Sequence, residues 1–301
     1  MRSLLIGADG QVGHELLGRF ESQGEVLATT RSGQLADGRE CLALDLCNAE
    51  ALRAAVAKAS ADLVVNAAAY TAVDRAEKEK DEAFAVNATA PDVLAKACAR
   101  FGVPLVHFST DYVFPGTSSR PLAESDPVGP VSVYGASKLA GEQAIRASGG
   151  RHKIFRLCWV YGPRGHNFLR TMLRLAAERD ELRVVADQFG CPTPSAWIAE
   201  AVVRAVSRRP ELRGTWHLSA SGSTSWHGFA EAIFVEGLRS GILDRGPLLS
   251  AISTADYPTT ARRPAYSVLD NSLFKRDFGI GLPDWRHGVE EVVTAIRHRA
   301  G

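Results

Sequence analysis

The sequence predicts an α/β protein with a doubly wound parallel sheet and a smaller C-terminal lobe. Short apolar runs alternate with longer helical patterns through the first 160 residues, and this alternation loosens afterwards. Strands separated by helices need crossover connections, which produce parallel strands covered on both faces. We therefore expect the sheet in residues 1–160 and the smaller lobe in residues 161–301, interleaved with the first part.

Each expected element follows from its local pattern. Apolar runs of strand length lie at Ser3–Ile6, Glu25–Thr30, Cys41–Leu44, Asp62–Asn66, Pro104–Ser109 and Lys153–Leu157. Helical periodicity falls between them, at Val12–Ser22, Asn48–Ala59, Asp81–Arg100 and Tyr134–Ala147. In the second half, helices are expected at Phe168–Arg179, Trp197–Ser207, Trp226–Ser240 and Arg286–His298, between stretches rich in Pro, Gly and Ser.

The composition excludes several classes of function. The chain has 35 Lys and Arg against 34 Asp and Glu, which is not the basic footprint of a nucleic-acid binder. No apolar run approaches the roughly 20 residues of a membrane span. The five cysteines form no C-x-x-C pair, which favours a cytoplasmic chain with reduced thiols. The eight histidines lack metal-ligand spacing, so we expect a small-molecule ligand and no metal.

Glycines gather directly after the first expected strand, in Gly7-Ala8-Asp9-Gly10-Gln11-Val12-Gly13. Such a turn lets the backbone approach a pyrophosphate closely and lets the following helix pack against the strand. The helix N-terminus then offers free N–H groups to the phosphates. This pattern predicts a Rossmann-type NAD(P) site that includes Gly7, Gly10, Gln11, Val12 and Gly13.

The end of the second expected strand indicates which nicotinamide cofactor is used. It reads Ala28-Thr29-Thr30-Arg31-Ser32, with no acid to bind a ribose 2′-OH. Arg31 suits a 2′-phosphate and Thr30 could bond to it, so NADPH is favoured over NADH, unless Arg31 simply faces solvent. Further along, the expected adenine contacts are Asp45 and Leu46, and the small residues expected beside the dinucleotide are Ala67, Ala68 and Ala69.

Candidate catalytic residues follow the fifth expected strand and open a later helix. Thr110 ends the strand, and Tyr134 and Lys138 lie four residues apart, on one helix face. A phenol has a pKa of about 10, which a nearby ammonium lowers. Tyr134 would protonate a carbonyl oxygen while the nicotinamide delivers hydride. Thr110 would orient the carbonyl, and Lys138 would hold the nicotinamide ribose.

With these motifs the chain resembles the extended short-chain dehydrogenase/reductases, and within them the dTDP-4-dehydrorhamnose reductase family. The matching segments are Gly10–Gly13, Val65–Asp74, Ser109–Gly116, Val133–Gly135, Trp159–Tyr161, Asn167–Phe168, Asp187–Thr193 and Ala261–Pro264. The resemblance implies NAD(P)H-dependent reduction of the 4-keto group of dTDP-4-dehydro-L-rhamnose to dTDP-L-rhamnose, a sugar typically used in bacterial surface polysaccharides.

The resemblance also implies roles for single residues. The residues implied to border the cofactor include Tyr70 and Thr71. The 4-keto sugar would contact Thr110, Asp111 and Trp159, and the dTDP portion would be held by Asn167, Gln188, Phe189 and Arg263. Trp159 has a second interpretation, as a core aromatic at a strand end.

Departures from the family pattern leave other questions open. Some relatives dimerise through carboxylates around Mg²⁺. This chain has Glu15, but Ala196 stands where another acid is expected, so a bridging Mg²⁺ is not expected. The chain could be a monomer or a homodimer. Two alternatives are a reductase for another dTDP-4-keto-6-deoxysugar and a non-catalytic regulatory subunit; the intact Thr110, Tyr134 and Lys138 oppose the second.

Overall fold

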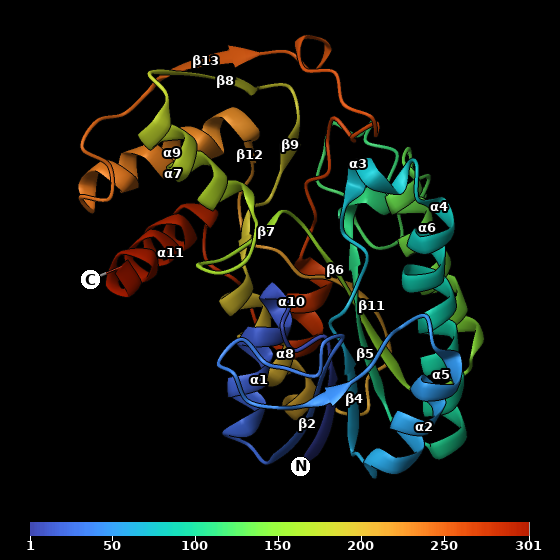
Figure 1. Ribbon diagram of the computed structural model, residues 1–301. Helices are drawn as coiled ribbons and strands as arrows, with labels where there is room; N and C mark the ends of the chain where they lie inside the picture. Colours follow the sequence, from blue (N-terminus) through green and yellow to red (C-terminus); the bar gives the residue numbers. More distant parts are fainter. Residues whose placement is uncertain (301) are drawn as a thin grey trace.

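The computed structural model describes residues 1–300, and its central feature is a seven-stranded parallel sheet (Figure 1). The strand order is β11-β6-β5-β4-β1-β2-β3. The strands are β1 (Arg2–Ile6), β2 (Glu25–Thr30), β3 (Leu42–Ala43), β4 (Leu63–Asn66), β5 (Leu105–Thr110), β6 (His152–Leu157) and β11 (Gly214–His217). The order reverses between β1 and β4, and ligands of such sheets bind at this switch point. The predicted doubly wound α/β fold is confirmed.

Helices cover both faces of the sheet because side chains alternate along each strand. One face packs against α2 (Ala49–Ala59), α5 (Ala90–Phe101) and α6 (Val133–Ala147). The other face packs against α1 (Gln11–Glu21), α8 (Ser195–Arg208) and α10 (Ser272–Phe278). In β1, Leu4 and Ile6 join the core of the first face, and Leu5 joins the core of the second.

The smaller lobe lies at the upper left of Figure 1 and has its own apolar core. It consists of α7 (Phe168–Glu178), α9 (Trp226–Arg239) and α11 (Trp285–Ala300) with the parallel pair β8 (Glu181–Val185) and β13 (Leu248–Ile252). Leu169, Phe229 and Trp285 are buried in that core. The second half of the chain contributes elements to the main sheet as well as to this lobe.

Short elements connect the two parts. Two small ladders pair β7 (Val160–Tyr161) with β10 (Thr193–Pro194) and β9 (Phe189–Gly190) with β12 (Thr224–Ser225). Single turns occur at α3 (Val73–Ala76), η2 (Asp111–Val113) and η3 (Thr254–Asp256). In the described residues, none of the helices has the length and apolar character needed to cross a membrane.

The helix expected at Asp81–Arg100 is not continuous. It consists of α4 (Lys80–Phe84), a π-helical turn η1 (Ala85–Thr89) and α5. Single π-helical turns often occur at functional sites. Here the turn contains Asn87, whose side chain bonds to two other segments of the candidate site described below.

Candidate active site

The glycine turn joins the carboxyl ends of three strands at the switch point. Gly7 has a φ of +81°, and its N–H donates to the Thr29 carbonyl at 3.0 Å. A Cβ on Gly7 would lie 2.7 Å from the backbone nitrogen of Ala68, and a Cβ on Gly13 would lie 2.0 Å from the Gly7 oxygen. Only glycine fits at these two positions, so the turn can bring backbone close to a ligand.

The N-terminus of α1 fits the diphosphate of a dinucleotide. Gly10 is the N-cap residue and gives no side-chain hydrogen bond, and the first turn contains no acidic residue. The first N–H groups of a helix have no helical acceptor, and the helix dipole adds partial positive charge there. Gln11, Val12 and Gly13 form this first turn. Backbone donors without a competing carboxylate are what a bound pyrophosphate requires.

At the end of β2, the Thr30 side chain has partners within the protein. Thr30 is only 1% exposed, and its hydroxyl oxygen accepts from the backbone N–H groups of Gly33 and Gln34 at 3.0 and 3.1 Å. This hydroxyl closes its own turn, and its contact with a 2′-phosphate stays a prediction. Arg31 is exposed beside it. Asp45, the expected adenine contact, is also exposed and accepts from the Cys47 N–H at 2.9 Å.

The segment Ala67–Thr71 follows β4 and is held in place by Asn87. The Asn87 carboxamide accepts from the Tyr70 N–H and donates to the Tyr70 carbonyl, both at 2.9 Å. The same amide nitrogen donates to the Ser137 hydroxyl of α6 at 3.0 Å. A Cβ on Gly141 would lie 2.1 Å from the backbone carbonyl oxygen of Asn87, so α6 packs directly on the π-helical turn. Asn87 is not among the predicted site residues, because its only local sign is an amide within a helical pattern.

The structure brings together the residues predicted to be catalytic. Thr110 ends β5, and its hydroxyl donates to the Asp111 carboxylate at 2.9 Å. Tyr134 and Lys138 lie on α6, which begins beside Tyr112. The Tyr112 and Tyr134 rings meet edge to face, with centroids 5.7 Å apart. The Thr110 side chain also lies close enough to Tyr134 to lower the pKa of its phenol.

The pKa of the Tyr134 phenol does not follow the expectation. Burial raises it, the Thr110 side chain opposes the rise and the Asp111 carboxylate adds to it, and the resulting pKa is about 12. The expected lowering of this pKa by Lys138 was wrong for the chain alone. The Lys138 amine instead lies 3.4 Å from the His107 ring, and burial lowers its own pKa to about 8. A phenol that remains protonated at neutral pH suits a proton donor.

Asp111 is a buried carboxyl group at the floor of the site. It is 2% exposed and accepts hydrogen bonds from Thr110 and from the Cys158 thiol, the latter at 3.2 Å. Burial raises its pKa to about 6. Taking a carboxylate out of water favours its neutral form, so this group titrates close to neutrality.

Trp159 lies within an aromatic stack. Its ring is parallel to Trp226, with a centroid distance of 3.5 Å, and a Cβ on Gly190 would lie 2.5 Å from the ring. Its φ of +43° is uncommon for a bulky residue and indicates local strain. The stack agrees better with the core-aromatic interpretation than with an open face for a sugar ring.

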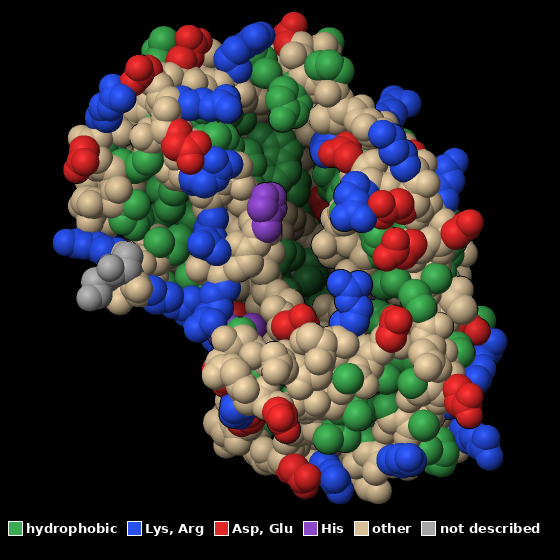
Figure 2. All heavy atoms as spheres, viewed as in Figure 1, with side chains coloured by type: hydrophobic (Ala, Val, Ile, Leu, Met, Phe, Trp, Pro, Cys, Tyr) green, Lys and Arg blue, Asp and Glu red, His purple; other side chains and the backbone are tan. Residues whose placement is uncertain are grey.

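A cavity of about 840 Å³ separates the smaller lobe from the sheet (Figure 2). Figure 2 shows hydrophobic side chains in the depth of this hollow and Lys and Arg side chains around it. Of the predicted substrate residues, Gln188, Asn167 and Arg263 line it. The amide of Gln188 donates to the Thr254 hydroxyl at 3.0 Å. Phe189, next to Gln188, is 40% exposed.

The polar groups of Asn167 are used inside the protein. Its side-chain oxygen caps α7 by accepting from the Arg170 N–H at 3.0 Å. Its amide nitrogen donates to the Gln11 side chain and to the Gly162 carbonyl, both at 2.9 Å. Asn167 therefore connects the start of α1 with the smaller lobe.

Arg263 already has an anionic partner. Its guanidinium lies 2.6 Å from the Asp74 carboxylate, which also accepts from the Ala261 N–H at 2.9 Å. These bonds hold the segment that follows η3 against α3, and Tyr257, Thr259 and Arg263 of that segment line the cavity. A ligand diphosphate would have to replace the carboxylate of Asp74 at this guanidinium.

Glu15, the acid considered for Mg²⁺, is paired with a cation. Glu15 lies 3.0 Å from Arg19, which also faces Glu200 at 3.5 Å, and Ala196 offers no ligand. Within residues 1–300, no group of three or more His, Cys, Asp or Glu side chains is arranged to hold a metal ion.

The fold and the site together define a Rossmann-fold oxidoreductase of the short-chain dehydrogenase/reductase type. Residues 1–298 match the family described as the RmlD substrate binding domain, and the chain belongs to that family. It is 47% identical to the dTDP-4-dehydrorhamnose reductase of Burkholderia thailandensis, covering 96% of this chain and 97% of the relative. It is 42% identical to the enzyme of that name from Shigella flexneri, covering 98% of both chains.

Solved structures agree with this assignment. A dTDP-4-dehydrorhamnose reductase from Clostridium acetobutylicum has a TM-score of 0.89 at 34% identity, covering 99% of this chain and 100% of that one. The Bacillus anthracis enzyme of the same name, solved in complex with NADP, has a TM-score of 0.87 at 32% identity, covering 97% and 98%.

Proposed function

We propose that the chain catalyses NAD(P)H-dependent reduction of the 4-keto group of dTDP-4-dehydro-L-rhamnose, which gives dTDP-L-rhamnose. The observation that carries the proposal is the group formed by Thr110, Tyr134 and Lys138 at the carboxyl edge of the sheet, near the uncapped start of α1. The full-length relatives named above support the same reaction.

Tyr134 is the proposed proton donor. The reduced nicotinamide, when bound, supplies a hydride to the carbonyl carbon. Tyr134 gives its phenolic proton to the carbonyl oxygen, and its raised pKa keeps that proton in place until the substrate arrives. Thr110 offers a second hydroxyl to the same oxygen once it turns away from Asp111. Lys138 holds the nicotinamide ribose and returns a proton to Tyr134.

The remaining roles concern binding. Arg31 is free to meet a 2′-phosphate, so we propose a preference for NADPH, and the NADP complex of the Bacillus anthracis relative is consistent with it. Arg263 exchanges Asp74 for the substrate diphosphate, since guanidinium groups bind phosphate by paired charge-assisted hydrogen bonds. Gln188 and Phe189 border the remaining part of the nucleotide sugar.

We also propose a cytoplasmic location, because the chain contains unpaired cysteines and needs a reduced nicotinamide. One chain supplies every residue of the candidate site, so a monomer would suffice, and a homodimer is equally compatible.

The test is a reaction with defined 4-keto sugars. Purified protein, NADPH and dTDP-4-dehydrorhamnose should show falling nicotinamide absorbance, with dTDP-L-rhamnose identified by NMR. Tyr134→Phe should lower kcat by about 100-fold or more while NADPH binding is retained. Faster turnover of another dTDP-4-keto-6-deoxysugar would favour the first alternative. A chain that binds cofactor but reduces no member of the panel would favour a regulatory role.

A further inference from the structure

A buried row of three polar side chains runs from the sheet to the catalytic helix. Asn66 of β4, His107 of β5 and Lys138 of α6 are each at most 2% exposed. The Asn66 amide nitrogen lies 3.2 Å from His107 Nδ1, and His107 Nε2 lies 3.4 Å from Lys138 Nζ. None of the proposed roles above involves His107.

The backbone fixes the polarity of this row. The Asn66 side-chain oxygen accepts from the Ala68 N–H at 3.2 Å, so its amide NH₂ must point at His107. An NH₂ group only donates, and therefore His107 Nδ1 must accept. A neutral imidazole that accepts at Nδ1 carries its proton on Nε2, which faces Lys138.

The contact between His107 and Lys138 then depends on the charge of the lysine. An ammonium group has only donors, so Nε2–H and an ammonium would place two donors in contact inside the protein. A neutral amine can accept the Nε2–H bond. Buried donors without acceptors are costly, and a doubly protonated imidazole would leave unmatched donors at both ring nitrogens. Every contact in the row is satisfied only when both groups are neutral.

We propose that His107, held by Asn66 as the tautomer protonated at Nε2, is a positioning residue that stabilises the neutral amine of Lys138 and so sets the pH at which this lysine takes up a proton. The inference rests on the proposed function for its consequence in catalysis. After Tyr134 has protonated the product oxygen, the Lys138 ammonium transfers a proton to the phenolate. The resulting amine accepts the His107 bond and is reprotonated from water.

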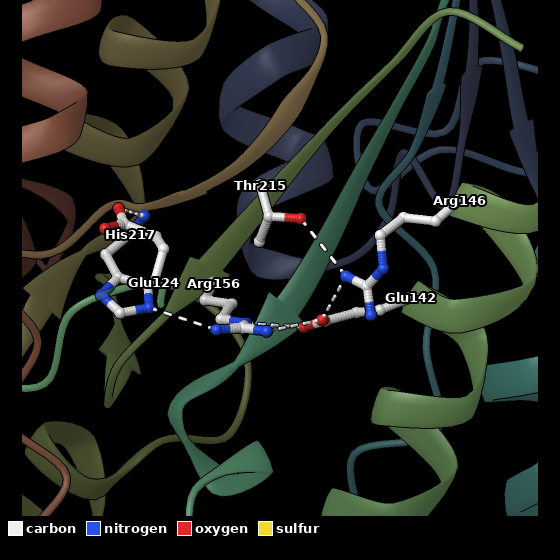
Figure 3. Close-up of polar contacts among 6 residues, drawn as sticks. All are labelled: Glu124, Glu142, Arg146, Arg156, Thr215 and His217. Atoms are coloured by element: carbon white, nitrogen blue, oxygen red, sulfur yellow. Dashed lines mark hydrogen bonds and ion pairs between the residues drawn. The ribbon is translucent and has the colours of Figure 1, made fainter. Parts of the chain in front are cut away.

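The carboxylate nearest to the row raises the pKa of Lys138, which opposes the effect of His107, but this carboxylate is neutralised by arginines. Glu142, one turn after Lys138 on α6, is fully buried and raises the lysine pKa. Its carboxylate is held by Arg156 of β6 at 2.8 and 2.9 Å and by Arg146 at 3.0 Å (Figure 3). Burial lowers the pKa of Lys138 to about 8, and burial together with the Lys138 charge lowers that of His107. Asn87 and Ser137, which pack nearby from η1 and α6, are uncharged.

The first test needs no substrate. Nitrogen NMR of histidine-labelled protein should show His107 as the neutral tautomer protonated at Nε2 from about pH 6 to about pH 9, with the signal assigned by its loss in His107→Gln. Protonation on Nδ1, or titration of the ring in this range, would contradict the proposal. Because neither result depends on turnover, this test can fail while the proposed reaction stands.

The second test is the pH dependence of kcat. In His107→Gln the carboxamide can turn its oxygen to an ammonium, so the loss of activity on the basic side should move up by about one pH unit. His152→Gln, at the start of β6 and away from this row, is the matched control and should not move it. A lower rate with an unmoved profile would mean that His107 only supports the fold, and would overturn the proposal.

Discussion

The inner and outer walls of the candidate site are built differently. At the inner wall, which is the end of β5 and the start of α6, Thr110, Asp111 and Lys138 are buried and bonded to groups of the same wall. At the outer wall, where Arg263 lines the cavity, this residue is joined to Asp74 by a partly exposed ion pair. The segment that carries Arg263 also contributes Tyr257 and Thr259 to the lining of the cavity.

The difference indicates how the two walls serve a reaction. Groups that act on the reacting atoms must already be in position, because reorganising them during the reaction raises the activation free energy. Groups that hold a charged ligand can be paired within the protein beforehand and exchange partners when it binds. An exposed ion pair contributes little to stability, so its exchange costs little. We therefore expect substitutions on the first wall to change kcat or stability, and those on the second to change KM.

The largest effect on stability is expected for Asp111→Asn. The pKa of Asp111 is raised from 3.8, its value in the unfolded chain, to about 6 in the folded protein. The stabilisation that its protonated form provides is therefore complete below about pH 3.8 and is lost as pH rises through about 6. Asparagine does not titrate. Between about pH 3.5 and about pH 7.5, the unfolding free energy of the variant relative to the unsubstituted protein should therefore increase by about 2–3 kcal/mol.

Urea unfolding at both pH values measures this difference. Asp126→Asn is the control of opposite sign, because the bond with Arg120 lowers the pKa of the half-buried Asp126. That variant should lose relative stability as pH rises. If the Asp111→Asn difference stays constant with pH, Asp111 is not a buried carboxyl of raised pKa.

The next largest effect concerns the outer wall. Arg263→Ala should raise KM for the nucleotide sugar by roughly 10- to 100-fold with little change in kcat, because one charge-assisted pair to the diphosphate is lost. Asp74→Asn is the matched variant: it frees the guanidinium, so KM should stay the same or fall. Steady-state kinetics distinguish the two variants. A large loss of kcat in Arg263→Ala would mean that this wall also positions the reacting atoms.

A smaller effect is expected at the cofactor end of the cleft. Arg31→Ala should weaken NADPH binding by about 10-fold and leave NADH binding unchanged, since only NADPH carries the 2′-phosphate. Thr30→Val should change neither, because its hydroxyl closes its own turn. Fluorescence titration with both cofactors measures this, and equal losses for the two cofactors would exclude Arg31 as the selecting group.

The smallest effect is expected where the two parts of the molecule meet. Asn167→Ala removes the cap of α7 and the bond to Gln11, and should cost about 1 kcal/mol of unfolding free energy. Asn167→Ser retains a capping oxygen but loses the amide donor to Gln11 and to the Gly162 carbonyl, so it should cost less. Thermal unfolding compares them. If both variants cost the same, the amide bonds rather than the cap carry the effect.

The sequence was most informative where a short motif determines its own geometry. The Gly7–Gly13 turn and the spacing of Tyr134 and Lys138 on α6 are local, and the structure has them in the expected elements. The strands of the first half also agree with expectation to within a residue or two.

Other features depend on residues that are distant in sequence and could not be predicted. Trp159 stacks on Trp226, and β11 joins the main sheet from far along the chain. Asn87 acts through a π-helical turn within a pattern that indicates a regular helix. The pKa of Tyr134 depends on burial, which the spacing of Tyr and Lys does not reveal.

A crystal structure with oxidised cofactor and the 4-keto nucleotide sugar is the most direct test of the central claim. The distance to measure joins the Tyr134 hydroxyl oxygen and the sugar's keto oxygen. We expect a hydrogen-bond distance of about 2.6–3.2 Å, with Thr110 on the same oxygen and Arg263 on the diphosphate. A keto group that lies beyond reach of Tyr134 and bonds to another donor would contradict the proposed mechanism.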